Sequence, residues 1–205
     1  GKGREMENLT AIAHARKSEA EAKAAQALVD KAARLAGKKE RAEREAAEQP
    51  AKMVVMAAAA AERAAAARAA LEAEGGCAAE ALEENQSMQE DERIVLQAMF
   101  GEDECTLHEG CADGGDARPG VTLVVQAANK KGDDRSIRLR ARMPPEYPSH
   151  LPPACEILEG VETRLEAAFV ADSLALLFFD ESVGSCVVPM WAEWLRDEWI
   201  AKQTS

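Results

Sequence analysis

Residues 136–153, SIRLRARMPPEYPSHLPP, contain the two patterns on which the fold of this chain depends. In the first half, residues 136–143, apolar and charged side chains alternate strictly. A period of two predicts a β-strand with one buried face and one solvated face. The predicted solvated face carries three arginines: Arg138, Arg140 and Arg142.

The second half of the stretch, residues 144–153, is governed by proline. Its five prolines are Pro144, Pro145, Pro148, Pro152 and Pro153. Because proline lacks an amide donor and fixes φ, these residues exclude helix and strand and predict an extended, rigid arm. Tyr147, the single tyrosine of the chain, lies within this arm.

The arm also carries a family pattern. Tyr147-Pro148, followed after three residues by Pro152-Pro153, reads YPxxxPP and resembles the signature of RWD domains. These domains are relatives of the ubiquitin-conjugating enzymes that lack the active site. Residues 98–103 resemble the end of the family's opening helix, and residues 181–184 resemble the turn before its last helix. The resemblance spans roughly residues 87–202.

The resemblance implies an α+β fold in which an antiparallel sheet of about four strands has helices on one side. It assigns a structural role, bracing the arm on the sheet, to the motif residues Tyr147, Pro148, Pro152, Pro153 and Gly184. It also implies a non-catalytic module that docks regulatory or ubiquitin-pathway proteins. The closing segment, residues 182–195, is most similar to RWD domains of RING-between-RING ubiquitin ligases.

Local patterns predict the other elements of this domain. Further strands are expected within residues 104–109, 121–127 and 154–158, a Gly- and Asp-rich loop over residues 110–120, and a turn over residues 129–134 with positive φ at Gly132. Capping boxes predict helix starts at Ser87 and Thr163, the second helix running to Leu177. A last helix is expected near Cys186, with an apolar face formed by Val187, Trp191, Leu195 and Trp199.

The first part of the chain, residues 5–74, is rich in alanine and charged side chains, a composition typical of long solvated helices. Gly37, Pro50 and the pair Gly75-Gly76 are predicted breaks that divide it into about three helices. Large apolar residues are too sparse for a sustained coiled-coil seam, so two interpretations stay open, a semi-rigid spacer or a partner-binding helix. The predicted organisation is an extension over residues 1–75, a hinge over residues 76–86 and an RWD domain over residues 87–202.

Charge is unevenly distributed along the chain. Residues 1–75 contain 14 basic and 12 acidic residues, whereas the remainder contains 11 and 25, so the net charge of −12 comes from the second part. An acidic domain argues against nucleic acid as a partner and favours a protein with a basic patch.

No apolar run reaches the roughly 18 residues of a membrane span, and we expect no membrane partner. The five cysteines are not spaced like a secreted disulfide scaffold, which favours reduced thiols and a cytoplasmic location.

The sequence argues against catalysis and against a metal or other cofactor. Residues 154–186 contain no histidine or asparagine that could accompany a conjugating cysteine. Cys155 and Cys186 are interpreted as buried structural thiols, although a helix start at Cys186 would lower the pKa of its thiol. Cys105-x-x-His108-x-x-Cys111 has zinc-ligand residue types but lacks the second pair that structural zinc requires.

Two sets of residues are candidate partner contacts. The arginines on the predicted strand face either keep that face soluble or bind an acidic partner segment. Trp194 and Trp199 belong to the apolar face of the last helix and could reach the rim of that face.

Two alternatives to an independent docking module stay open: the partner-binding portion of a RING-between-RING ligase, and an inactive conjugating-enzyme variant.

Overall fold

The structure is a computed structural model that describes residues 2–75, 77–109, 118–128 and 134–202. By its internal contacts the chain divides into two units, Gly1–Lys52 and Met53–Ser205. The first unit is the greater part of a single helix, and the second contains the sheet and all other helices of the described chain.

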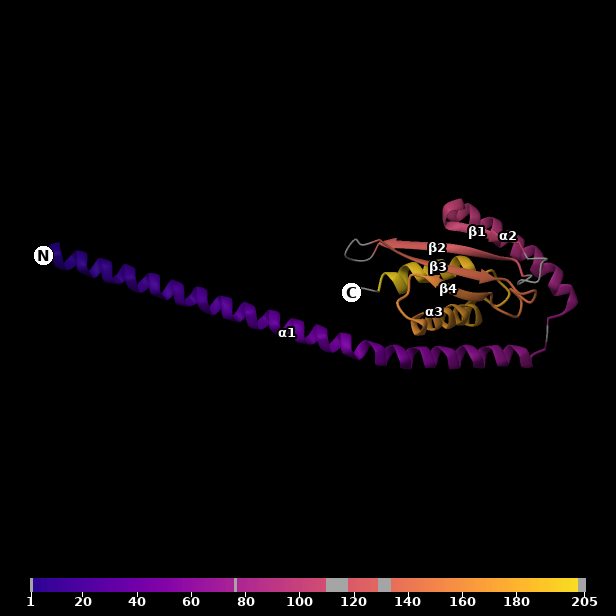
Figure 1. Cartoon of the computed structure of the whole chain (residues 1–205), viewed down its shortest axis with the longest axis horizontal. Helices are drawn as coiled ribbons and strands as arrows, with labels where there is room; N and C mark the ends of the chain where they lie inside the picture. The colour runs from indigo at the N-terminus through magenta and orange to yellow at the C-terminus, as the bar shows by residue number, and fades with distance from the viewer. Residues whose placement is uncertain (1, 76, 110–117, 129–133, 203–205) are drawn as a thin grey trace. The chain divides into compact units, whose positions relative to one another are not determined.

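Helix α1 runs from Lys2 to Ala73 (Figure 1). The predicted division into about three helices is wrong, because the helix continues through both Gly37 and Pro50. Glycine costs about 1 kcal/mol and proline about 3 kcal/mol inside a helix, and long alanine-rich flanks propagate the helix past such isolated penalties. The helix does end near the predicted glycine pair, where Gly75 has a φ of 115°.

The sheet has four antiparallel strands in the order β1-β2-β3-β4 (Figure 1). The strands are β1 (Cys105–His108), β2 (Gly120–Ala128), β3 (Asp134–Arg142) and β4 (Ala154–Glu159). Each overlaps the segment in which the sequence predicted a strand. The α+β fold class is confirmed.

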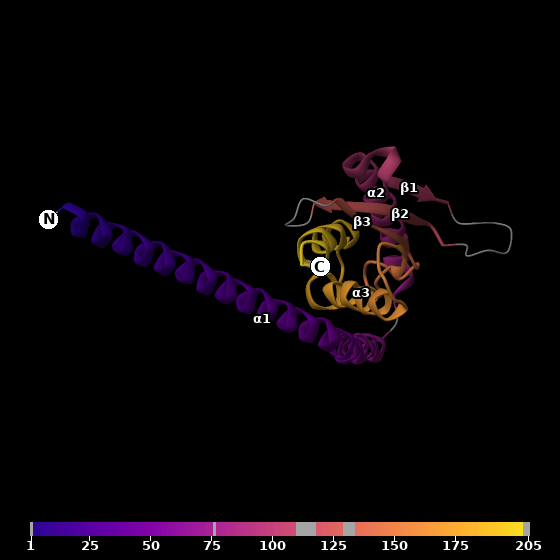
Figure 2. The ribbon, with the colours of Figure 1, turned by 60° about the vertical axis from the view of Figure 1, so that its left-hand side comes forward.

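One face of the sheet forms the core. Alternate residues of the two central strands are fully buried on that face: Val121, Leu123, Val125, Ile137, Leu139 and Ala141. The segments packed against them are α2 (Ala79–Glu104), α3 (Arg164–Leu177), η1 (Phe178–Ser182), α4 (Val188–Trp194) and η2 (Leu195–Ile200). Figure 2 shows α3 and the C-terminal segments on the same side of the sheet. The predicted apolar face of the last helix is buried there, with Trp191 and Leu195 fully buried.

The two predicted capping boxes have different outcomes. The Thr163 prediction is confirmed, since its hydroxyl accepts from the Glu166 amide and the Glu166 carboxylate accepts from the Thr163 amide. The Ser87 prediction is wrong, because α2 begins at Ala79 and residues 79–86 of the expected hinge are helical. Strong helix formers in this segment allow the helix to start earlier, without a side-chain cap.

The proline arm is turned and not extended, which corrects the prediction. Residues 145–150 form successive turns, in which the Tyr147 amide donates to the Pro144 carbonyl at 3.0 Å and the His150 amide to the Glu146 carbonyl at 2.8 Å. The Tyr147–Pro148 peptide is cis. Proline excludes strand and helix here as expected, but its fixed φ is equally compatible with a turn.

Several predictions lie outside the described residues. These are the loop at residues 110–117, the turn at residues 129–133 with Gly132, and the position of Cys111. The last helix, expected near Cys186, begins at Val188 with Pro189 in its first turn.

The end of α1 is part of the second unit. Ala57, Ala60 and Ala64, spaced three and four apart, are buried there, and two of them pack with Leu176 and Phe169 of α3. The small alanine side chains let this helix approach α3 closely. Part of the predicted extension therefore contributes to the packing of the domain.

Candidate protein-interaction site

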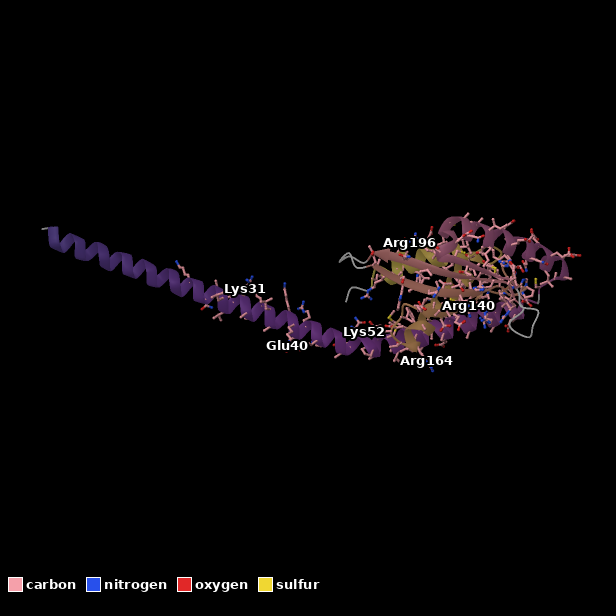
Figure 3. The ribbon with its side chains drawn as sticks, turned by 45° about the horizontal axis from the view of Figure 1, so that its top comes forward. Lys31, Glu40, Lys52, Arg140, Arg164 and Arg196 are labelled. Atoms are coloured by element: carbon pink, nitrogen blue, oxygen red, sulfur yellow. The ribbon has the colours of Figure 1, made fainter. Side chains whose placement is uncertain are left out.

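The solvent-exposed face of the sheet carries the arginines that the sequence singled out. On β3, Ile137, Leu139 and Ala141 point into the core, so the intervening arginines point to the opposite face. The Arg138 side chain is 47% exposed and the Arg140 side chain 34%, and Arg142 is half-buried. Figure 3 labels Arg140 on the sheet.

Two carboxylates on β4 hold this arginine row. Arg140 lies opposite Glu156, with Nη1 3.6 Å from Oε2, and Arg138 lies opposite Glu159, with Nη1 3.5 Å from Oε1. Both glutamates are more than half exposed. Such pairs contribute at most about 1 kcal/mol, so a competing carboxylate can replace them at little cost.

A basic corner extends the row toward β1. His108 Nε2 lies 2.7 Å from the Thr122 hydroxyl on β2. Burial first, and then the positive charges of Arg140, Arg142 and Arg93, lower the pKa of His108. The histidine is therefore neutral at neutral pH, and the positive charge of this corner belongs to the arginines.

The two predicted tryptophan contacts differ in exposure. Trp199 is only 8% exposed and packs on Phe169, with ring centroids 5.7 Å apart. A side chain this buried belongs to the core and cannot form a broad contact with a partner. Trp194 is half-buried at the edge of the same cluster.

Behind the sheet, Tyr147 is fully buried and links three segments of the domain. Its hydroxyl lies 2.8 Å from Oε2 and 3.0 Å from Oε1 of Glu92 on α2, to which it donates. The same hydroxyl accepts from the Val187 amide at 2.7 Å, and Glu92 Oε1 accepts from the Val188 amide at 2.9 Å. The carboxylate thus joins α2 and the turn to the start of α4.

Two further polar residues of α2 hold the turn. Gln89 donates through Nε2 to the carbonyls of Pro144 and Tyr147, at 2.8 and 2.7 Å. Asn85 donates to the Pro145 carbonyl at 3.0 Å. Because the prolines of this segment lack amide donors, the side-chain amides of α2 supply further donors to these carbonyls.

The sequence did not predict this polar cluster. The helix start predicted at Ser87 would place Glu92 near a solvated helix end, but Glu92 is 3% exposed and lies well inside α2. The available signal was the spacing of Asn85, Gln89 and Glu92, which places them on one helix face. That face also carries the buried Leu96.

Burial raises the pKa of Glu92 from 4.5 to about 7, although hydrogen bonds from Tyr147 and the Val188 amide partly oppose this shift. Burial also raises the pKa of Tyr147, and the Glu92 charge adds to the effect. The phenol therefore stays protonated and acts as the hydrogen-bond donor to the carboxylate.

The remaining motif residues lie around the same turn. Pro148, Pro152 and Pro153 are buried, and the Gly184 amide donates to the Pro148 carbonyl at 2.8 Å. Gly184 has a φ of 85°, a conformation that glycine adopts without strain. The motif thus surrounds Tyr147 and contributes no exposed side chain.

Comparison with known families gives a match to the RWD domain over residues 87–199, more than half of the chain. The chain belongs to the RWD domain family. RWD domains resemble ubiquitin-conjugating enzymes, are generally non-catalytic, and generally mediate protein–protein interactions. A comparison with curated proteins finds no match.

Cys155 and Cys186, the two cysteines considered for catalysis, are not activated as nucleophiles. Cys155 on β4 and Cys186 before α4 are half-buried. Burial raises the pKa of each thiol to about 12, with added negative charge from Glu156 beside Cys155 and from Glu92 beside Cys186. The expected lowering of the Cys186 pKa is wrong, because burial of the thiol and then the negative charge of Glu92 raise it.

The predicted zinc-like spacing has a structural explanation for two of its members. Cys105 is buried in the core of the RWD domain, and His108 hydrogen-bonds Thr122. Among the residues that the structure describes, no group of three or more His, Cys, Asp and Glu side chains could hold a metal ion. The same residues include no helix long and apolar enough to cross a bilayer.

Proposed function

We propose that this RWD domain docks an acidic segment of a partner protein on the solvent face of its sheet and catalyses no reaction itself. The observation that carries the proposal is the arginine row of β3, which stands on an exposed face within an otherwise acidic domain. The net negative charge of the domain disfavours acidic partners in general, so a row of arginines on one face is the surface best suited to bind them.

The chemistry of the row suits carboxylates. A guanidinium presents a planar fork that can bind a carboxylate through two hydrogen bonds. Arg138 and Arg140 already hold exposed glutamates at 3.5 and 3.6 Å, distances that leave their geometry loose. An acidic partner segment would replace Glu156 and Glu159 with better-placed carboxylates.

The ubiquitin pathway in the cytoplasm is the setting that we propose for this partner. Its support is the relation between RWD domains and ubiquitin-conjugating enzymes, together with the likeness of residues 182–195 to RWD domains of RING-between-RING ligases. A second candidate function is that the domain is the partner-binding portion of a RING-between-RING ligase. Dense pairs of Cys and His residues encoded in the gene beyond Ser205 would support this ligase candidate, and their absence would contradict it.

The docking proposal is tested with full-length variants. Arg138→Ala combined with Arg140→Ala is compared with a matched control, Arg164→Ala combined with Arg196→Ala, which removes two exposed arginines elsewhere in the domain (Figure 3). Each tagged chain is incubated with cell extract, and captured proteins are quantified by mass spectrometry. We expect the sheet variant to lose partners that the control retains, with both variants unfolding at the same temperature.

Equal capture by the two variants would contradict the docking face. The absence of catalysis has its own test, a thioester assay with ubiquitin, its activating enzyme and this chain. We expect no adduct that reducing agent releases. An adduct that Cys155→Ala or Cys186→Ala abolishes would contradict a non-catalytic role.

A further inference from the structure

Helix α2 has a second, outward-facing surface that the core does not use. Its inward face carries Asn85, Gln89, Glu92 and Leu96, all buried. Its outward face carries four apolar residues, Ile94, Val95, Ala98 and Met99, which we call the α2 strip. Because these residues are one, three or four positions apart, they form a continuous surface on the helix.

The α2 strip is unusually exposed for its composition. Ile94 is 58% exposed, Val95 49% and Met99 58%. Single exposed apolar side chains are normal on protein surfaces, but a contiguous group of large ones marks an interaction site. Methionine adds a flexible side chain that adapts to a partner surface.

Four exposed acidic side chains flank the strip along the chain. Glu90 and Asp91 lie one helical turn before it, and Glu102 and Asp103 follow Gly101, where the helix is kinked. None forms an ion pair with another side chain that the structure describes. The surface thus combines an apolar centre with a negative rim whose charge is not neutralised within the described part of the chain.

We propose that the α2 strip binds an amphipathic helix of a partner protein, with apolar residues against the strip and Lys or Arg against the acidic rim. A helix presents apolar side chains at three- and four-residue spacing, which matches the spacing of the strip. The rim selects basic flanks and disfavours acidic ones.

This surface is independent of the arginine row. The inward face of α2 packs on the core side of the sheet, whereas the arginines stand on the opposite face. The two surfaces also select opposite charge, since one is acidic and the other basic. The proposal therefore goes beyond the docking function inferred for the sheet, and each can fail without the other.

The test uses the full chain and a designed probe. The probe is a fluorescein-labelled helical peptide of about five turns, with leucines spaced three and four apart and lysines at the other positions. Its affinity is measured by fluorescence anisotropy. The test variant is Ile94→Asn with Met99→Asn, and the matched control is Leu165→Asn with Val183→Asn, two exposed apolar residues on other segments.

We expect the α2 strip variant to bind the probe about tenfold more weakly or worse, because two large apolar contacts are lost. The control should bind like the unmodified chain, and a peptide with glutamate in place of lysine should not bind. Equal binding by both variants would show attraction by charge alone and would overturn the proposal. Concentration-dependent dimers in sedimentation equilibrium, abolished in the strip variant, would also overturn it by identifying a second copy as the occupant.

Discussion

Replacing Tyr147 with phenylalanine isolates the contribution of one buried hydroxyl to this fold. The aromatic ring is kept, so its packing on Phe178, with centroids 6.0 Å apart, should persist. The change removes the donor to Glu92, at 2.8 and 3.0 Å, and the acceptor for the Val187 amide, at 2.7 Å.

The magnitude follows from these two losses. A hydrogen bond to a charged group contributes about 1.5–3 kcal/mol, and a buried amide left without a partner costs about 1–3 kcal/mol. The two effects share one hydroxyl and do not add fully. We therefore expect Tyr147→Phe to lower the free energy of unfolding by about 3 kcal/mol, a large share of the stability of an ordinary domain.

Urea unfolding followed by tryptophan fluorescence measures this change. All three tryptophans, Trp191, Trp194 and Trp199, lie in the domain, so the signal does not report on the first half of α1. Ser173→Ala is the control, because its hydroxyl donates to the Phe169 carbonyl of its own helix and bridges no separate segments of the described chain. A loss of under about 0.5 kcal/mol in Tyr147→Phe, the range of ordinary surface changes, would refute the role assigned to the hydroxyl.

Three other substitutions have defined outcomes. Glu92→Gln should make the free energy of unfolding less dependent on pH. The pKa of Glu92 is raised from 4.5 to about 7, so this carboxyl group binds more protons in the folded than in the unfolded chain between these values. In the unmodified chain the free energy of unfolding therefore falls as the pH rises through this window. This fall, about 3 kcal/mol, should disappear in urea titrations of the variant, and an unchanged pH profile would contradict the assignment. Gly160→Ala should cost at least about 2 kcal/mol, because the new Cβ would lie 2.2 Å from the Ser136 carbonyl oxygen at a φ of 95°; a thermal melt like that of the unmodified chain would exclude this clash. Thr163→Ala should cost about 1 kcal/mol through loss of the capping box at α3, and equal urea midpoints for the variant and the unmodified chain would count against it.

The sequence alone determined the elements whose signals are local. Alternation over residues 136–143 identified β3 and its inward and outward faces, and Thr163 with Glu166 identified the start of α3. The YPxxxPP pattern identified the family. Each of these signals depends on residues within a few positions of one another, so no knowledge of distant contacts was required.

Only the tertiary structure decided which polar residues are buried and what surrounds them. Glu92 bonds to a tyrosine 55 positions away and to an amide 96 positions away. The exposed acids just before it, Glu90 and Asp91, suggested a solvated helix end instead. Burial of the Cys186 thiol, and then the negative charge of the Glu92 carboxylate, raise the pKa of Cys186, which is the reverse of the shift expected from its place in the chain. Burial of a charge depends on groups that the fold brings together from distant parts of the chain, and local spacing carries no information about them.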